Sequence, residues 1–382
     1  MQIFLLVFFL IYGLYHLYFF IKVRPTKPFT VPLVLWLALM TAAPLLTRVA
    51  ERQGHEMLAR VMAVSGYAWM GFVFEFFCLG LALDLLLFLV RTVSRWFSPV
   101  CRPRMSPRAF LLTIGTISLV VCVYGYWAAH TLQVRRVTIS TDKPLGTNQR
   151  LKIVQISDLH LGVMIGESFL KQVIDLVALE NPDLLVATGD IVDGQGDGLA
   201  SLSGQFLQLQ PRLGKFAATG NHEFYMGLDN SLGFLKEAGF TVLRNRTQNV
   251  QGILDITGVD DLSASYFPGY IELPESGVLG SVNGSERFHL FLKHRPVVET
   301  ASLGLFDLQL SGHVHGGQLF PFNYITGLKF PWPVAELVSL RDGYLYVSRG
   351  TGTWGPPIRI FAPPEITVIE IVFDGEGGNK VQ

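Results

Sequence analysis

Five short clusters of potential metal ligands stand in the second half of the chain, each after an apolar stretch. They offer carboxylate, amide and imidazole groups but no thiolate, because Cys78, Cys101 and Cys122 all precede them. Such donors suit Mn²⁺, Fe or Zn²⁺ better than Mg²⁺ or Ca²⁺. Two such ions about 3.5–4 Å apart can clamp a phosphoryl group and provide hydroxide at neutral pH. The clusters are Asp158-Leu159-His160, Gly189-Asp190-Ile191-Val192-Asp193, Gly220-Asn221-His222-Glu223, His294, and Gly312-His313-Val314-His315.

The elements that must position these clusters are short apolar strands. The pattern predicts strands over residues 151–157, 183–188, 215–219, 288–293 and 306–310. Helical patterns fall between the first of them, at 168–179 and 228–238. This alternation predicts a mainly parallel sheet with helices on its faces. Because ligands bind at the carboxyl ends of such strands, all five clusters are expected at one edge of the fold.

Each cluster alone is weak evidence for a site. A single histidine after a strand, such as His294, is more often packed or capped than a ligand. Five of the nine histidines fall inside the clusters, however, and this concentration favours a site. Among the other polar residues, we expect His289 on the surface, because it lies on the strand face opposite to that of His294. We expect Asp183 and Asp260 in turns.

The order and spacing of the clusters resemble the calcineurin-like metallophosphoesterase superfamily, over about residues 151 to 372. The resemblance implies a four-layer α/β/β/α sandwich, a β-sandwich with helices on both outer faces. It implies hydrolysis by a hydroxide that bridges two metals. It also implies that His222 is a catalytic histidine and not a ligand, oriented by Asp193. The implied ligands are Asp158, His160 and His315 for the first metal, Asp190 as the bridge, and Asn221, His294 and His313 for the second.

The sequence from His315 to Gln318 and the tail at 346–366 resemble a membrane-associated bacterial phosphodiesterase branch, related to UDP-2,3-diacylglucosamine pyrophosphatases and to animal transmembrane metallophosphoesterases. This implies cleavage of a phosphodiester or pyrophosphate bond, with a lipid-linked substrate as one option. Gly194 stands where the Ser/Thr protein phosphatases have arginine, which argues against that class. Arg349 and Arg359 are candidate phosphate-binding residues, because guanidinium suits phosphate oxygens; surface salt bridges are the alternative.

The first 130 residues are apolar and basic, with 11 Lys and Arg against 4 Asp and Glu, whereas the rest has 19 against 26. Apolar stretches at 1–21, 29–46, 58–90 and 109–130 predict about four transmembrane helices. A cleaved signal peptide is a poor explanation of the first, because a basic start is missing and further apolar segments follow. We therefore expect a transmembrane region over 1–130, a linker and first strand over 131–150, and a phosphoesterase domain over 151–375.

Basic residues in the short loops predict orientation in an inner or plasma membrane. If the two most basic loops are cytoplasmic and there are four spans, the second half is extracytoplasmic; three spans would reverse this. The basic residues of these loops are Lys22, Arg24 and Lys27, and Arg91, Arg95, Arg102, Arg104 and Arg108.

Two other functions compete with a membrane-anchored hydrolase. The chain could be a non-catalytic scaffold with a decayed phosphoesterase fold, although none of the seven implied ligands is missing. It could be a transporter regulated by the metal domain, since Glu75 and Asp84 lie within apolar runs. Inverted repeats, which many transporters have, are not visible. The expected partners are the lipid bilayer and a phosphoester; the acidic second half argues against nucleic acid.

Overall fold

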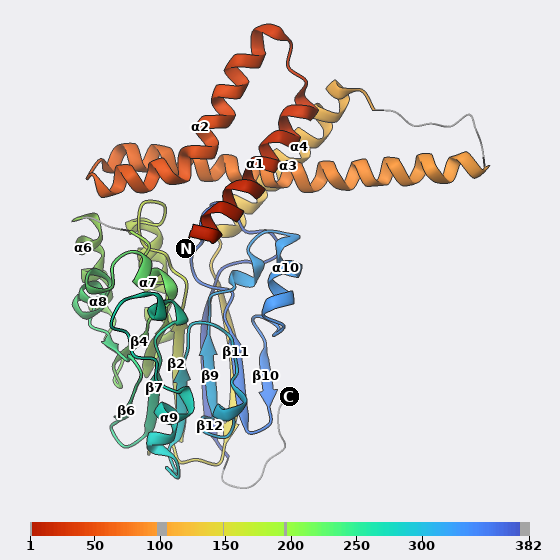
Figure 1. The fold of residues 1–382 in the computed structure, drawn as a ribbon. Coiled ribbons are helices and arrows are strands. Elements are labelled where there is room, and N and C mark those ends of the chain that lie inside the picture. Colours follow the sequence, from red (N-terminus) through yellow and green to blue (C-terminus); the bar gives the residue numbers. More distant parts are fainter. Residues whose placement is uncertain (1, 98–104, 148, 195–196, 375–382) are drawn as a thin grey trace. The chain divides into compact units, whose positions relative to one another are not determined.

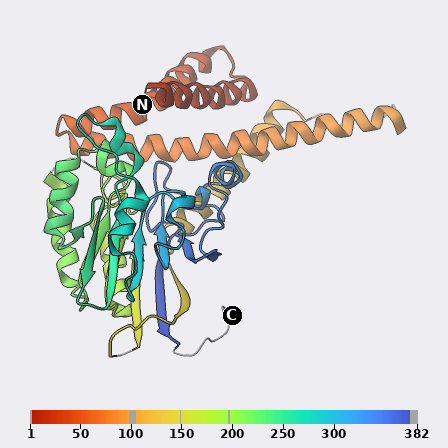
Figure 2. The same ribbon diagram turned by 60° about the horizontal axis from the view of Figure 1, so that its bottom comes forward.

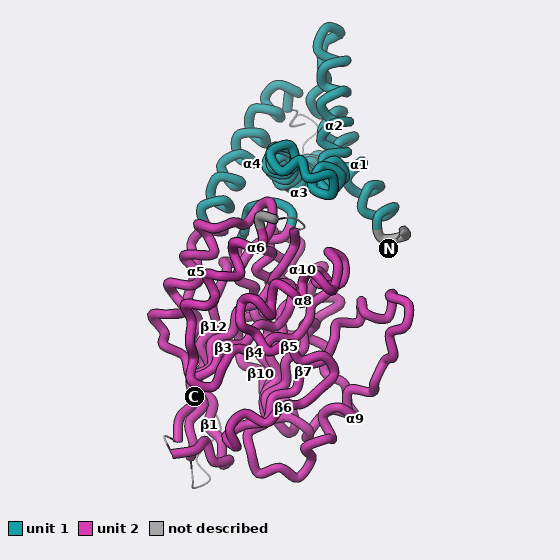
Figure 3. Tube along the Cα trace, turned by 90° about the vertical axis from the view of Figure 1, so that its left-hand side faces the viewer, with its two compact units in different colours: residues 1–127, 355–360 teal, residues 128–354, 361–382 magenta. Residues whose placement is uncertain are grey.

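The structure is a computed structural model that describes residues 2–97, 105–147, 149–194 and 197–374. It divides into two compact units (Figure 3). The helical unit comprises residues 1–127 together with 355–360, and the sheet unit comprises residues 128–354 and 361–382. Arg102 and Arg104, which contributed to the predicted orientation, lie outside the described residues, as does position 375 at the predicted domain end.

The helical unit has four helices that are long and apolar enough to cross a membrane: α1 Gln2–Val23, α2 Lys27–Arg52, α3 Glu56–Phe97 and α4 Pro107–Ala129. Two are longer than the apolar stretches indicated. Helix α2 runs for 26 residues through Pro32 and Pro44. Helix α3 runs for 42 residues, because its helical pattern continues beyond the apolar run into the basic stretch around Arg91.

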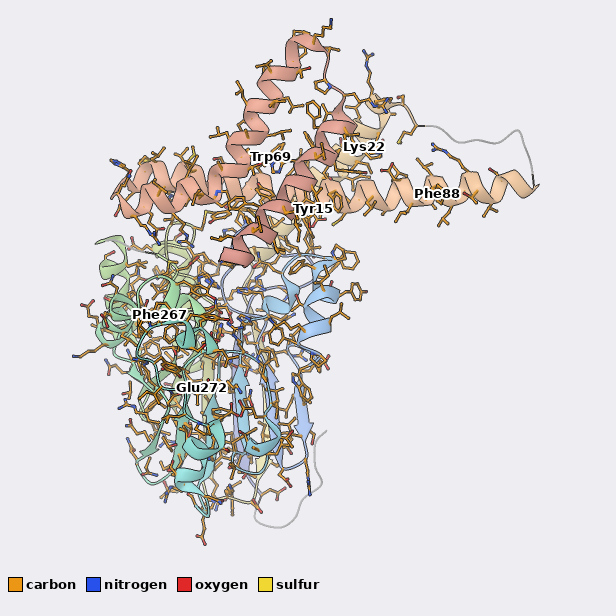
Figure 4. All side chains as sticks on the ribbon, viewed as in Figure 1. Tyr15, Lys22, Trp69, Phe88, Phe267 and Glu272 are labelled. Carbon is orange, nitrogen blue, oxygen red and sulfur yellow. The ribbon has the colours of Figure 1, made fainter. Side chains whose placement is uncertain are left out.

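Polar groups in this unit join α1 to α3. Lys22 pairs with Asp84 at 2.6 Å, and Tyr18 Oη donates to the same carboxylate at 2.7 Å. Trp69 Nε1 donates to His16 Nε2 at 2.9 Å. Figure 4 marks Lys22 on α1 and Trp69 on α3. Asp84 thus has a structural role between two helices, which weakens one motive for a transporter.

The sheet unit holds two six-stranded sheets (Figure 1). The first has the order β1-β12-β2-β3-β4-β5 and the second β10-β11-β9-β8-β7-β6. Strands β2, β3, β4 and β5 are mutually parallel, as are β7, β8, β9 and β11. The strands are β1 Gln133–Thr141, β2 Arg150–Ile156, β3 Leu184–Thr188, β4 Lys215–Ala218, β5 Thr241–Val242, β6 Arg246–Val250, β7 Leu254–Gly258, β8 Phe288–Leu292, β9 Leu308–Ser311, β10 Leu337–Leu340, β11 Gly343–Val347 and β12 Glu365–Phe373.

Side chains alternate between two apolar layers along the strands. In β2, Ile153 faces the core between the sheets, together with Leu290 and Leu310 of the second sheet. Val154 faces the opposite layer, where it packs with Leu170 of α5. Helix α9 packs on the outer face of the second sheet. The predicted four-layer α/β/β/α sandwich is therefore confirmed (Figure 2). The helices of this unit are α5 Glu167–Glu180, α6 Asp197–Ser203, α7 Asn221–Tyr225, α8 Leu228–Glu237, α9 Glu275–Leu279 and α10 Phe322–Lys329.

One prediction about this unit is wrong. His289 was expected on the surface, but it is buried, and its Nε2 lies 2.7 Å from Thr257 Oγ1 on β7. The reason is that β8 lies between β7 and β9 in a sheet that is covered on both faces, so the opposite strand face is not solvent.

Candidate metal centre

All seven predicted ligands lie just beyond the carboxyl ends of five strands. Asp158 and His160 follow β2, Asp190 follows β3, and Asn221 follows β4 in the first sheet. His294 follows β8, and His313 and His315 follow β9 in the second. Because the two sheets are stacked, donors from both converge on one place.

The first group of donors consists of Asp158, His160 and His315. His160 Nε2 and His315 Nε2 are 3.1 Å apart, and His315 Nε2 is 3.5 Å from Asp158 Oδ1. Ligands held about 2.0–2.2 Å from a metal lie roughly 3 Å from one another, so this spacing fits a cation. The other ring nitrogen of His160, Nδ1, is buried and makes no hydrogen bond within the described chain.

The second group converges on His294 Nε2. Asp190 Oδ2 lies 3.1 Å from it, Asn221 Oδ1 3.2 Å and His313 Nδ1 3.1 Å. His294 Nδ1 donates to Thr188 O at 2.8 Å. That hydrogen bond fixes the tautomer and leaves Nε2 available as a ligand.

Asp190 lies between the two groups. Its Oδ2 is 3.1 Å from His294 Nε2 and 4.0 Å from His160 Nε2. A carboxylate in this position can serve both groups at once. The bridging role that the sequence resemblance implies for Asp190 stays a prediction.

The turns that present the donors have unusual backbone conformations. Asp158, His160, Asp190, His313 and His315 all have φ between 50° and 71°. Residues other than glycine rarely adopt this left-handed region, and such strain concentrates at functional sites. The turns are also closely packed: a Cβ on Gly220 would lie 2.2 Å from Asp190 Oδ1.

Glu223 is a positioning residue that the sequence analysis missed. Its buried carboxylate accepts hydrogen bonds from four backbone N–H groups, at 2.7, 2.9, 2.8 and 3.3 Å. The donors are Gly220, Asp190, Ile191 and Val192. Glu223 therefore ties the turn after β3 to the turn after β4. The available signal was its place three residues after Gly220, as in a capping box.

His222 and Asp193 form a pair beside the first donor group. His222 Nδ1 donates to Asp193 Oδ1 at 2.7 Å, and the backbone N–H of His222 donates to Asp190 Oδ1 at 2.8 Å. Two half-exposed rings flank the imidazole. The ring centroids of Tyr225 and Trp354 lie 5.6 and 5.7 Å from it, at interplanar angles of 64° and 72°.

Burial and neighbouring charges shift the pKa values of the ionisable donors. Burial lowers the pKa of His160 to about 3, so this imidazole is neutral and can bind metal. Burial also opposes ionisation of His294, but the Asp190 carboxylate outweighs it and raises the pKa of His294 to about 10. Burial raises the pKa of Asp158 to about 6. Buried carboxylates of this kind call for nearby positive charge, and divalent cations would supply it; the donor set therefore fits metal.

Comparison with known proteins agrees with this geometry. The model of the calcineurin-like phosphoesterase family matches residues 151–317. An uncharacterized metallophosphoesterase of Aquifex aeolicus is 39% identical over 258 residues, which cover 67% of this chain and 97% of that protein. The chain belongs to the calcineurin-like phosphoesterase family. It therefore has a hydrolase domain of a kind that uses divalent metals.

Two further likenesses concern the helices and the fold. The Danio rerio transmembrane protein with metallophosphoesterase domain is 32% identical over 317 residues, which cover 77% of this chain and 72% of that protein. Together with the four apolar helices, this indicates a membrane phosphoesterase. A solved 5'-nucleotidase precursor from Thermus thermophilus aligns with a TM-score of 0.36 and 18% identity, over 60% of this chain and 56% of that one.

The two candidate arginines of this phosphoesterase lie in different surroundings. Arg349 Nε donates to Glu365 Oε2 at 2.7 Å, and its Nη2 donates to Gln133 at 3.3 Å. Arg359 is fully buried and belongs to the helical unit, where its backbone N–H donates to Gly125 O at 2.9 Å.

Proposed function

We propose that this phosphoesterase cleaves phosphodiester or pyrophosphate bonds with two divalent cations. Asp158, His160 and His315 would hold one cation, and Asn221, His294 and His313 the other, with Asp190 shared. The observation that carries the proposal is the convergence of donors from both sheets, with Asp190 Oδ2 between His160 and His294. The donor chemistry supports Mn²⁺, Fe or Zn²⁺.

The bound cations would neutralise phosphoryl charge and make a water molecule nucleophilic at neutral pH. The protein's own step belongs to His222. Asp193 accepts the Nδ1–H hydrogen bond and so leaves Nε2 of His222 for the substrate. From there His222 would donate a proton to the leaving oxygen or a hydrogen bond to a phosphoryl oxygen.

The membrane helices bear on the substrate and the location. We propose a lipid-linked phosphoester, because anchoring keeps the site where such a substrate is concentrated. We place the protein in the inner or plasma membrane with the sheet unit extracytoplasmic, which the basic loops support. Labelling of an introduced Gln251→Cys thiol by a membrane-impermeant maleimide in intact cells tests the side; protection of that exposed residue would reverse the orientation.

The test of the reaction uses the full chain in lipid nanodiscs loaded with Mn²⁺. Hydrolysis of bis-p-nitrophenyl phosphate is compared with that of p-nitrophenyl phosphate. We expect diester cleavage that Asp190→Ala and His222→Ala abolish. His289→Gln is the matched control, because His289 is a buried histidine outside the donor groups. Absence of cleavage by a folded, metal-loaded chain would favour the scaffold alternative.

A further inference from the structure

The exposed apolar side chains of the sheet unit are gathered beyond the carboxyl ends of a few strands. Among its described residues, Leu179 and Leu207 are the exceptions. The others follow β4, β7, β8, β9 or β11 and are called here the apolar rim. They are Tyr225, Leu262, Tyr266, Phe267, Ile271, Leu273, Val297, Phe320, Phe322, Tyr324, Ile325, Leu328, Trp354 and Phe361.

The strand directions put the rim and the metal donors at one edge of the unit. Strands β7, β8, β9 and β11 are parallel, so the segments after them leave the second sheet at the same edge. The donors His294 and His313 leave from that edge too, and they meet Asn221 and Asp190, which leave the first sheet after β4 and β3. The rim and the metal centre therefore lie at the same edge of the sheet unit.

Two segments of the rim are especially apolar for their position. Leu328 on helix α10 is 88% exposed, and Tyr324 and Ile325 lie on the same helix. The segment after β7 exposes Tyr266 and Ile271 by 77% and 76%; Figure 4 labels Phe267 and Glu272 in that segment. Tyr324 and Ile325 lie four and three positions before Leu328, so these side chains form one apolar surface on the helix. Such exposed apolar surface is uncommon on a solvated face and marks a site of interaction.

The chain passes between the sheet unit and the helical unit three times, each time at this same edge of the sheets. Strand β12 is antiparallel to β2 and parallel to β1, so β1 and β12 begin at the edge where β2 ends. Only residues 130–132 separate α4 from β1. Before β12, residues 355–360 belong to the helical unit, where Ile358 contacts the positions of Gly71 on α3 and Gly125 on α4. Trp354 and Phe361 of the rim directly flank that segment.

We propose that the apolar rim lies in the lipid interface, so that the metal centre opens onto the headgroup layer. The occupant is the bilayer because the connection to α4 and the segment 355–360, which packs with α3 and α4, both leave from this edge, and these helices are of membrane-spanning length. Tyr, Trp and Phe side chains with aliphatic neighbours are typical of interfacial segments. Lys329, at the end of α10, adds a cation suited to lipid phosphate. The further consequence, that the substrate is a headgroup phosphoester, rests on the proposed function.

The test measures contact with lipid directly, by means independent of hydrolysis. The full chain, with Cys78, Cys101 and Cys122 replaced by alanine, receives Leu328→Cys and a polarity-sensitive fluorophore in lipid nanodiscs. Lipids that carry a nitroxide near the headgroup should quench this fluorophore several-fold more strongly than they quench the same fluorophore attached at Leu179→Cys. Leu179 is the matched control, since it is an exposed helical leucine outside the rim.

Two outcomes would overturn the proposal. A fluorophore at position 328 that stays in water and is quenched no more than at 179 would show that the rim is free. A fluorophore that is shielded but not quenched would show that protein covers the rim. If Leu328→Cys does not fold, Ile325→Cys on the same helix, with Leu207→Cys as its control, makes the same measurement.

An activity measurement separates this proposal from the proposed function. The double variant Ile325→Glu with Leu328→Glu should lower kcat/KM for a phosphoester embedded in the nanodisc several-fold and leave that for soluble bis-p-nitrophenyl phosphate unchanged. Equal effects on both substrates would contradict lipid contact by the rim. A wild-type chain that cleaves neither substrate would contradict the proposed function, and the quenching result would still decide the position of the rim.

Discussion

The side chain of Gln318 makes hydrogen bonds to both the backbone N–H and the backbone C=O of Trp354. The N–H of Trp354 donates to Gln318 Oε1 at 3.0 Å, and Gln318 Nε2 donates to Trp354 O at 3.0 Å. Gln318 stands three residues after the donor His315 and is itself buried, with φ of 54°. It thus links the turn that carries His315 to the indole that lies against His222.

This linkage predicts that Gln318 and Trp354 position His222. Trp354→Ala removes an aromatic contact worth about 0.5–1.5 kcal/mol. We therefore expect kcat/KM for bis-p-nitrophenyl phosphate to fall by up to roughly tenfold, mostly through kcat, with unchanged metal content. Gln318→Ala should act similarly, and Gln318→Glu less, because a carboxylate still accepts from the Trp354 N–H. Full activity in Trp354→Ala would mean that the indole does not position His222.

The His222 and Asp193 pair predicts a separate kinetic signature. Asp193→Asn leaves the size of the side chain unchanged but replaces the carboxylate that accepts the Nδ1–H hydrogen bond. General acid–base catalysis contributes about 10²–10⁴-fold, so we expect kcat to fall by roughly 10²-fold or more. The double variant with His222→Ala should lose little beyond His222→Ala alone, because the two residues act as one unit. Additive losses, or loss of metal measured by elemental analysis, would point to a different role for Asp193.

Glu223 predicts a loss of stability. In Glu223→Gln, an amide N–H₂ group replaces one acceptor oxygen and faces backbone N–H donors. Leaving buried donors unsatisfied costs about 1–3 kcal/mol each. We expect a lower thermal transition temperature, as measured by circular dichroism. We also expect weaker metal retention, because the turns after β3 and β4 both carry donors. Glu286→Gln, at an exposed carboxylate, is the control and should leave both unchanged.

The strands and donors could be predicted because their signals are local. In β2, apolar residues alternate between two cores and then give way at once to Asp158, so the strand and its ligand appear together in the sequence. The predicted helix at 228–238 corresponds to α8 for the same reason: its apolar face recurs at helical spacing. Family resemblance then supplied what periodicity could not, namely that the strands divide between two sheets.

Features that depend on distant neighbours could not be predicted. His289 was misplaced because its exposure depends on what covers the second sheet. The role of Glu223 depends on where the turn after β3 comes to lie. Residues 355–360 follow β11 in the sequence, yet they belong to the helical unit because Ile358 fits against Gly71 and Gly125. No pattern within Gly355–Ile360 indicates that partner.

Removal of metal should destabilise the sheet unit. Without cations, Asp158 and Asp190 are buried carboxylates, and burial keeps the neighbouring imidazoles of His160 and His313 neutral. Ligands that bind only the folded state raise stability by mass action. A chelator should therefore lower the thermal transition of the wild type and abolish diester cleavage, and Mn²⁺ should restore both. Asp190→Ala should show a smaller chelator effect. An equal shift in that variant would mean that the stabilising metal binds elsewhere.

Asp255 predicts how stability depends on pH away from the metal centre. Burial opposes its ionisation, but hydrogen bonds from Asn249, Arg287 and Ser285 outweigh it and hold the pKa below its usual value. A carboxylate of this kind stabilises the fold above its unfolded pKa of about 3.9, and the contribution disappears as pH falls through the lower folded pKa.

Asp255→Asn should therefore destabilise the chain at pH 7, by about 1–3 kcal/mol for hydrogen bonds to a charged group. The difference from wild type should persist to about pH 4 and shrink below it. Thermal transitions of the two proteins at each pH measure this, and loss of metal in acid affects both alike. A difference that stays constant down to acid pH would mean that Asp255 contributes through its shape and neutral hydrogen bonds, and not through its charge opposite Arg287.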